Sequence, residues 1–596
     1  MIRLRGRIVT LATVYSAAAA LLLVACIPDR AANLRKVEEY EARQAELAAA
    51  GLVEPSVGGT LNVGTVYLTL SAMSWNPADW AWKANHDTGM YYEQLFAADL
   101  DQSVTKGGPH PFRADAWLPS DAIRGELAET WHWEDELTLV VEIRRGVRIP
   151  AKEGVTDARD LDAYDVVASF ERIDRSPKKT SGYFDHVASV TARDDHTVVF
   201  AFSSFTSDWA YRFGYGYYSS ITPREIDQVD AGDWRNAVGS GPFQLVDYVA
   251  ANVQHYRRTP NYWDRERPAG ASRSYPIPFV DEVRYRIFKD PGTAYTALRT
   301  GKVDMLEIMP WLVVDHLKET TPELRWDRRL HDAGVFVALR VDQEPFDDVR
   351  VRRALNYAVD KGELLERLYG GHGELFGFPM HPDWGAYFQP LEEMPAAVQD
   401  LYRFQPERAR RLLEEAGLGD GFEFAMQVCA CNPSHLDLSQ VIADHLSRVG
   451  VTVRIEPLEY AAFLSTMTTG NHGPGYLMEN GHTNPTTSLR KNFTSGQLWN
   501  PSRWSDPDFD RAIEEVLGTR DEAERIGRLQ QLTAQVVAEA PYLFLPAPYV
   551  YAAWWPWVRN YGGELRGGAV RPAPIYSRIW IDHQLKAELG FAGDSR

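Results

Sequence analysis

The reactive side chains that lie close together in the body of this chain are two cysteines and a histidine, Cys429, Cys431 and His435. The cysteines end an alternating run, 422–428, that predicts a β-strand. Two residues apart on one strand face, their Cα atoms would lie about 6.5–7 Å apart, the outer limit for a disulfide; a turn at Asn432–Pro433 would bring them closer. The Cys-x-Cys-x₃-His spacing matches no common metal site. The pattern leaves a local disulfide or two free thiols, and we predict no metal.

Familiar catalytic motifs are missing from the sequence. Gly239-Ser240-Gly241 is not a nucleophile elbow, because Val238 stands where that motif needs a glycine. The sequence has no His-Glu-x-x-His zinc motif, no phosphate-binding Gly-Lys-Ser/Thr loop and no dinucleotide fingerprint, and its 15 histidines are scattered. We therefore predict a binding protein with no catalytic residues and no cofactor. An extracytoplasmic hydrolase and a sensory receptor are the alternatives from other classes.

Aromatic residues make up 12% of the chain, with 18 tryptophans. Trp75, Trp80 and Trp82 lie in the polar segment Ser-Trp-Asn-Pro-Ala-Asp-Trp-Ala-Trp-Lys, where neither a helical nor a strand period explains them. Trp499 and Trp504 flank another turn. Such loop tryptophans either pack in a core or offer stacking surfaces to a ligand.

The N-terminus carries an export signal. Three arginines precede an apolar run, 8–25, which ends in small residues before Cys26. Leu23-Val24-Ala25-Cys26 resembles a bacterial lipobox, which implies that residues 1–25 are removed and that Cys26 becomes acylated. The alternative is a transmembrane anchor, for which about eighteen residues is short. Lipidation predicts an extracytoplasmic protein held at a membrane only through its acyl chains, in the periplasm or on the outer cell face depending on Gram type.

The formal net charge is −19, and it becomes more negative once the signal arginines are removed. Such an acidic surface repels nucleic acid and anionic lipid headgroups. The length predicts two or three domains. Residues 30–57 are charged and alanine-rich, and we expect them to be a helical or disordered part of a lipidated tether over 26–57.

Alternating and β-branched runs predict strands at 59–63, 137–143, 197–202 and 280–287. Two helices follow from local signals. One begins after Asp347-Asp348 and carries an apolar stripe through Val359, and the other begins at Pro406 and ends at Gly417. Arg350, Arg352 and Arg353 lie mainly off the first stripe, which predicts a solvated basic face. Mixed elements of this kind predict an α/β protein with mixed sheets.

Five segments, in order from about residue 59 to 560, resemble the family 5 extracellular solute-binding proteins, the oligopeptide, dipeptide and nickel receptors of ABC importers. Residues 127–131 with 141–147 resemble that family's LAESW…F-x-LR-x-GV line, and 165–170 its DV-x-x-S helix. Residues 238–243 with 258–263 resemble GTGPF…RNP-x-YW. Residues 345–360 and 406–417 resemble its longest motif and its A-x-x-LL-x-EAG helix. These motifs identify the scaffold and not the ligand.

The resemblance implies a two-lobed periplasmic-binding-protein fold of type II, similar to cluster C, with a hinge and an extra inserted domain. Matching assigns 58–94, 219–333 and 547–596 to lobe I, 95–218 to the insert, and 334–546 to lobe II. It implies a monomer that captures a peptide or similar-sized oligomer between closing lobes and delivers it to an ABC permease and ATPase.

The same resemblance implies the ligand-binding residues. Trp80 and Trp82 lie on the loop that faces ligand in relatives, Tyr183 lies near the aromatic residue of the insert that faces ligand, and the second-lobe wall is formed by Met478, Asn480, Gly481 and His482. Peptide-binding members carry an aspartate four residues before a proline, which pairs with the α-amine of the peptide; here Gly481 takes that place. Either Glu479 replaces the missing acid or the ligand is a neutral oligosaccharide, while peptide binding through the backbone stays open.

Overall fold

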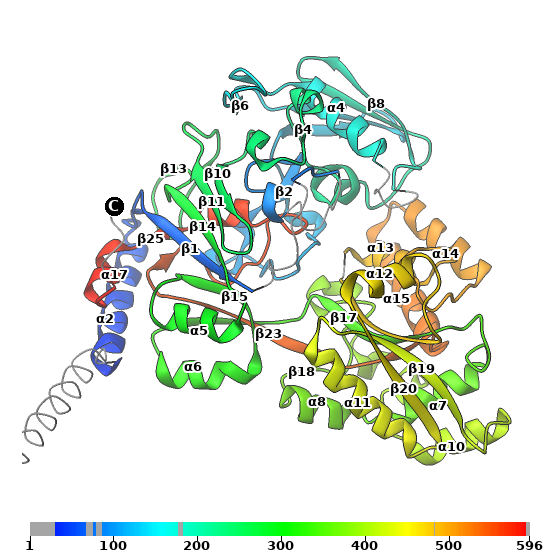
Figure 1. Cartoon of the computed structure of the whole chain (residues 1–596). Helices are drawn as coiled ribbons and strands as arrows, with labels where there is room; N and C mark the ends of the chain where they lie inside the picture. Colours follow the sequence, from blue (N-terminus) through cyan, green and yellow to red (C-terminus); the bar gives the residue numbers. More distant parts are fainter. Residues whose placement is uncertain (1–29, 67–74, 79–85, 177–182, 482, 592–596) are drawn as a thin grey trace, which may run out of the picture.

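The computed structural model describes residues 30–66, 75–78, 86–176, 183–481 and 483–591. Three sheets dominate it, and they lie in three regions of Figure 1. The buried apolar residues fall into two large clusters, one shared by the first lobe and the inserted sheet and one in the second lobe. The chain thus has the predicted α/β architecture of two lobes and an added domain.

The first lobe is built on an eight-stranded sheet. Its strands, in spatial order, are β10 (Phe243–Val249), β11 (Val253–Arg258), β14 (Glu282–Ile287), β1 (Thr60–Thr65), β15 (Met305–Pro310), β23 (Ala547–Trp554) and β16 (Arg325–Leu330), with β18 (Gly373–Glu374) also paired to β23. β1 runs parallel to both β14 and β15, and α5 (Pro291–Arg299) and α6 (Val314–Thr320) flank this region (Figure 1). The strands predicted at 59–63 and 280–287 are β1 and β14.

The inserted domain contains a four-stranded antiparallel sheet. Its strands, in spatial order, are β4 (Ala128–Trp133), β5 (Thr138–Ile143), β9 (Thr197–Phe202) and β8 (Val187–Asp194). β5 and β9 confirm two predicted strands and pair with Leu139 opposite Phe200. Helix α4 (Ala163–Asp174) packs on this sheet, and a capping box between Asp162 and Asp165 fixes its start.

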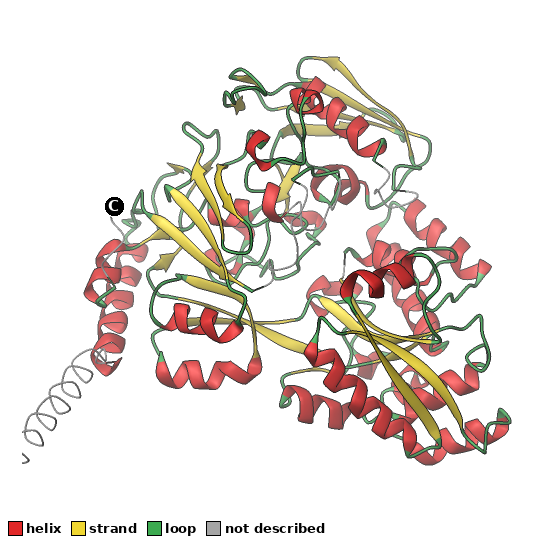
Figure 2. Cartoon of the chain, in the orientation of Figure 1, coloured by secondary structure: helices red, strands yellow, loops and turns green. Residues whose placement is uncertain are grey.

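The second lobe is built on a five-stranded sheet between helices (Figure 2). Its strands, in spatial order, are β20 (Val451–Leu458), β19 (Phe422–Cys429), β21 (Gly475–Gly481), β17 (Ala333–Leu339) and β22 (Tyr542–Phe544). Its helices are α7 (Val349–Ala358), α8 (Lys361–Tyr369), α9 (Ala396–Leu401), α10 (Pro406–Glu415), α11 (Pro433–Ser447), α12 (Tyr460–Thr468), α13 (Pro485–Phe493), α14 (Pro507–Gly518) and α15 (Glu522–Ala538).

Short crossovers join the two lobes. β16 of the first sheet ends at Leu330, and β17 of the second begins at Ala333. The return crossover runs from β22, ending at Phe544, to β23, beginning at Ala547. Because each crossover spans only two residues, the facing ends of the two sheets are held close together.

Both predicted helices of the second lobe are confirmed. Asp348 caps α7 through the backbone N–H of Arg350, and α10 begins at Pro406. The predicted solvated basic face on α7 is wrong for Arg352, which is only 4% exposed. Its guanidinium donates hydrogen bonds to the carbonyl oxygens of Glu539 and Phe346. Glu539 follows α15 and Phe346 precedes α7. The guanidinium of Arg352 is therefore buried, although it lies off the apolar stripe, and backbone carbonyls accept its hydrogen bonds.

The segment expected as a spacer begins with a helix, α2 (Arg30–Ala49), that packs on the first lobe beside α17 (His583–Glu588) in Figure 1. The buried Tyr40 hydroxyl donates to the carboxylate of Asp582, and Glu41 pairs with Arg559 at 2.7 Å and with Arg325 at 2.8 Å. Over this stretch the chain is therefore part of the folded body. Among the described residues, no helix combines the length and apolar character needed to cross a bilayer.

Candidate functional site

Three of the predicted second-lobe residues, Met478, Asn480 and Gly481, lie at the end of β21, next to a crossover. β21 pairs antiparallel with β17, and Gly481 lies opposite Ala333, the first residue after the crossover from the first lobe. Met478 and Asn480 are buried, whereas Glu479 and Gly481 are exposed. Since side chains alternate along a strand, Glu479 and Gly481 share the accessible face, and Met478 and Asn480 point into the lobe. The strand therefore presents positions 479 and 481 for contact with a ligand.

The backbone at Gly481 leaves room for a Cβ atom. A Cβ atom built on Gly481 would meet only the carbonyl oxygen of Asp332, at 3.9 Å, which is an ordinary contact. Nothing in the backbone therefore requires glycine at 481, since a Cβ atom is accommodated there.

A lysine from the next helix occupies the neighbourhood of Gly481. Asn484 caps α13, and Lys491 lies in the last turn of this helix. The ammonium of Lys491 donates to the Oδ1 atom of Asn480 at 3.1 Å and to the carbonyl oxygen of Gly481. Asn480 is held in place by its own hydrogen bond to Asn492. Burial lowers the pKa of Lys491 to about 8, with Asp332 opposing the shift, so the side chain is mainly an ammonium at neutral pH.

Asp332, in the crossover itself, lies in a polar cluster built from both lobes. Its Oδ2 atom accepts the backbone N–H of Asp115 at 3.2 Å, and the ring of His381 is 3.9 Å from its Oδ1 atom. Burial, followed by the charges of Asp115 and Asp383, raises the pKa of Asp332 well above its usual range. Asp115 in turn pairs with the buried Arg566 at 3.1 Å. Burial and the neighbouring acids thus disfavour the charge on Asp332, while the guanidinium of Arg566 lies beside Asp115.

Glu479 is the other carboxylate on the accessible face of β21. The ring of His435 lies 3.5 Å from its carboxylate. Although partial burial opposes ionisation, the hydrogen bond from His435 and the nearby His331 lower the pKa of Glu479 to about 2. Glu479 is therefore an anion, but one that a histidine already contacts.

The two cysteines form a disulfide, Cys429–Cys431, with their Cα atoms 5.1 Å apart. Of the two alternatives read from the sequence, the disulfide is the one observed. The turn after β19 brings the Cα atoms closer than a regular strand would allow. Both sulfur atoms are used in the disulfide, and the ring of His435 lies beside the carboxylate of Glu479.

The remaining predicted residues divide into two groups. Cys26, Trp80, Trp82 and His482 lie outside the described residues. Tyr183 is 8% exposed, and its ring packs edge-on against Tyr218. Its hydroxyl donates to the carbonyl oxygen of Arg212 at 3.3 Å. Its place in the structure is thus within an aromatic cluster at the edge of the insert.

The other tryptophans considered from the sequence pack in or against the cores. Trp75 is 6% exposed and makes an edge contact with Tyr248. Trp504 is equally buried and packs edge-on against Phe509, while Trp499 is half-buried against the second-lobe core. Of the two roles considered for these three tryptophans, core packing is therefore the one observed.

The insert also contacts the second lobe directly. The hydroxyl of Thr487 on α13 donates to the carboxylate of Asp208 at 3.1 Å. Arg520, between α14 and α15, lies 3.9 Å from the ring centre of Phe205. The Gly481 region thus lies between the crossovers on one side and these contacts on the other.

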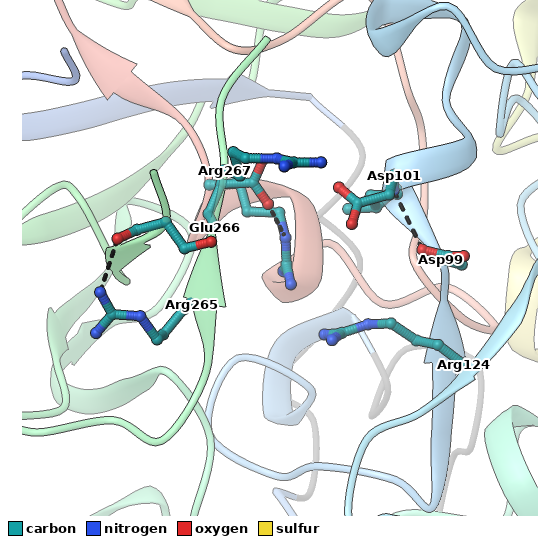
Figure 3. A pocket seen from close by; sticks show the side chains of 9 residues that line it. Asp99, Asp101, Arg124, Arg265, Glu266 and Arg267 are labelled. Atoms are coloured by element: carbon teal, nitrogen blue, oxygen red, sulfur yellow. Dashed lines mark hydrogen bonds and ion pairs between the residues drawn. The ribbon is translucent and has the colours of Figure 1, made fainter. Parts of the chain in front are cut away.

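One cavity, of about 150 Å³, opens in the first lobe and the insert (Figure 3). Charged residues line it, among them Asp99, Asp101, Arg124, Arg265, Glu266, Arg267 and Arg578. Arg578 pairs with Asp264 at 2.6 Å and with Glu266 at 2.8 Å, and Arg124 also pairs with Asp264 at 2.6 Å. The cavity is smaller than the ~300 Å³ typical of small-molecule sites, and no lining residue comes from the second lobe. We therefore assign these ion pairs a structural role.

Sequence reasoning missed Lys491 and Asp332. Lys491 is separated from Gly481 by the start of a helix, so the only available signal was a cation in the last turn of a proline-initiated helix. Asp332 lies in the crossover between two strands. It comes close to Gly481 only because β17 pairs with β21, and this pairing cannot be read from the neighbouring residues.

Comparisons with known proteins agree with this architecture. The family model for bacterial extracellular solute-binding proteins, family 5 Middle, matches residues 122–500. Heme-binding protein A of Haemophilus influenzae is 27% identical over 468 residues, covering 74% of this chain and 82% of the relative. The dipeptide-binding protein of Escherichia coli is 26% identical over 459 residues, covering 71% and 81%. The periplasmic binding protein DppA of Helicobacter pylori, solved with the peptide STSA, superposes with a TM-score of 0.70 at 20% identity, covering 88% of this chain and 99% of that one.

Proposed function

Because this chain belongs to the bacterial extracellular solute-binding proteins of family 5, we propose that it is the substrate-binding lipoprotein of an ABC importer for a peptide or similar-sized oligomer. Its general role as a solute-binding protein follows from the family. The proposal adds the ligand class, the lipid anchor at Cys26, and delivery to a membrane permease and its ATPase.

The observation that carries the proposal is the position of the β21 terminus. Glu479 and Gly481 are accessible on a strand whose end lies at a two-residue crossover between the lobes. A ligand held there would contact both lobes, and rotation about the crossovers would close the lobes around it. Relatives named for dipeptides and heme, and a structural neighbour solved with a peptide, support a ligand of this size. The lobe boundaries read from the sequence are part of the same proposal.

A neutral oligosaccharide is the second candidate ligand. The observation that favours it is Gly481 itself, since glycine contributes no carboxylate that could pair with a peptide α-amine. Trp80 and Trp82, the two tryptophans predicted to face the ligand, would then stack on sugar rings.

Mass spectrometry of the ligand released from protein purified without denaturation tests the proposal. We expect a single class of peptide-like or oligosaccharide ligand, which rebinds with saturation and is recovered unchanged. Conversion of the ligand by the purified protein would identify a hydrolase and overturn the proposal. Mass analysis of the mature chain and of a Cys26→Ser variant tests the anchor: acyl chains are expected on the first only.

A further inference from the structure

Helix α2 is fastened to the first lobe at its N-terminal end. Arg30, its first residue, pairs at 3.2 Å with Glu323, whose side chain is fully buried. Further along the helix, the ammonium of Lys36 donates to the carbonyl oxygen of Glu588, at the end of α17, at 2.7 Å. A chain end frays unless such contacts tie it down, and a buried carboxylate is costly without its cation. The start of α2 is therefore fixed on the folded body.

The rest of α2 and the chain that follows it are held as well. Val37 and Tyr40 belong to the apolar cluster shared by the first lobe and the insert, and Glu41 makes the two ion pairs described above. After the helix, the backbone N–H of Val53 donates to the carbonyl oxygen of Gly270 at 3.2 Å. These contacts join the segment to the first lobe, at the edge that lies away from the second lobe in Figure 1.

The lipidated residue of the proposed function lies a short way along the chain from this fixed end. Three residues separate Cys26 from Arg30. Even a fully extended chain spans about 14 Å at most between their Cα atoms. Because acyl chains on Cys26 would insert into the bilayer, Arg30 and the surface around Glu323 must then lie near the lipid headgroups. A flexible spacer would instead let the body move away from the membrane.

We propose that α2 seats the first lobe directly on the lipid bilayer, with the end formed by Arg30, Glu323 and the C-terminal end of α17 facing the headgroups. This inference rests on the lipid anchor of the proposed function and adds the surface through which the protein meets its membrane. Because the contacts of α2 described here are with the first lobe, the second lobe keeps its freedom to rotate about the crossovers. The first lobe is then the fixed part of the receptor and the second lobe its moving part.

Energy transfer from a dye on the protein to acceptor dyes on lipid headgroups tests this orientation. The acylated protein is extracted with detergent and reconstituted into vesicles of phosphatidylethanolamine and phosphatidylglycerol. Glu319→Cys places the dye on α6, close in the chain to Glu323. Ser272→Cys places it beside Gly51, at the opposite end of α2, and both dye positions are exposed. The two internal native cysteines form the disulfide and do not take the dye.

The two dyes should differ in the wild type. The 20 residues of α2 span about 30 Å, so we expect at least about twofold more energy transfer from position 319 than from position 272.

Two variants separate this orientation from a flexible attachment. An insertion of about twenty glycine and serine residues directly before α2 adds a spacer of about 25 Å and should remove the difference between the dyes. Tyr40→Ala with Glu41→Ala removes contacts that hold α2 and should remove it too. Glu38→Ala with Glu39→Ala, at exposed positions of the same helix, is the matched control and should keep the wild-type difference.

Thermal melting first establishes that each variant keeps a folded body. Equal transfer from the two dyes in the wild type, greater transfer from position 272, or a difference that survives the insertion or the Tyr40 variant overturns this inference and leaves the lipid anchor standing. If the wild type and Cys26→Ser both fail to attach to vesicles, the lipid anchor of the proposed function fails, and this inference with it.

Discussion

Arg571 connects the C-terminal segment to the base of the insert through a buried ion pair with Glu126, and its loss should destabilise the fold severely. Its guanidinium is fully buried. It donates to both carboxylate oxygens of Glu126, at 2.7 and 3.1 Å, to the carbonyl oxygen of Tyr92 at 3.1 Å and to the side chain of Gln94 at 3.3 Å.

Arg571→Met would leave the Glu126 carboxylate buried without its cation. Glu93, also buried, lies close enough that burial and the charge of Glu126 raise its pKa to about 8. Breaking a buried ion pair by removing one partner costs about 3–5 kcal/mol, and we expect a loss in that range. Arg571→Met combined with Glu126→Gln removes both charges and should recover at least about half of the loss, because no buried charge remains unpaired.

Urea unfolding at pH 7, followed by tryptophan fluorescence, measures these losses, since Trp131 and Trp133 report on the inserted sheet. Arg148→Met is the matched control. Arg148 pairs with Asp160 on the surface, with both side chains more than half exposed, so its loss should change stability by less than about 1 kcal/mol. A loss below about 1 kcal/mol for Arg571→Met, or no recovery in the double variant, would refute the reasoning.

Two further predictions concern the second lobe. Burial lowers the pKa of Lys361 to about 7, so between pH 7 and about 10 the unfolded chain binds more protons than the folded one. The free energy of unfolding in urea should therefore rise with pH over this range, by at most about 1.4 kcal/mol per pH unit. Lys361→Met should flatten that rise. An equally steep rise in the variant would contradict this assignment. Replacing Cys429 and Cys431 by serine should cost only about 1–2 kcal/mol, because the closed loop is very short; a loss above about 4 kcal/mol in thermal or urea unfolding would show that the disulfide does more than restrict the unfolded chain.

Elements governed by neighbouring residues could be predicted from the sequence. The α7 helix begins where Asp348 caps it, and α10 begins at Pro406 and is followed by Gly417 in the left-handed conformation. Strands β5, β9, β14 and β19 follow alternating or β-branched runs. Helix caps and the periodic spacing of apolar side chains depend on residues close together in the sequence, so they can be recognised without knowledge of the fold.

Contacts between distant segments could not be predicted in this way. Arg352 was expected in solvent because no local pattern shows that the carbonyl oxygen of Glu539 will meet it. Tyr40 docks α2 onto Asp582, at the opposite end of the chain, although α2 itself has only a weak apolar stripe. Such burial depends on which surfaces the fold brings together.

The candidate site shows the same division. The sequence by itself determined the family scaffold and the absence of an acid at Gly481, because both are properties of residues in order along the chain. Only the tertiary structure decided that Lys491 and Asp332 meet that glycine. The physical reason is that strand pairing and helix packing set the distances between charged groups, and residue types in order along the chain do not give these distances.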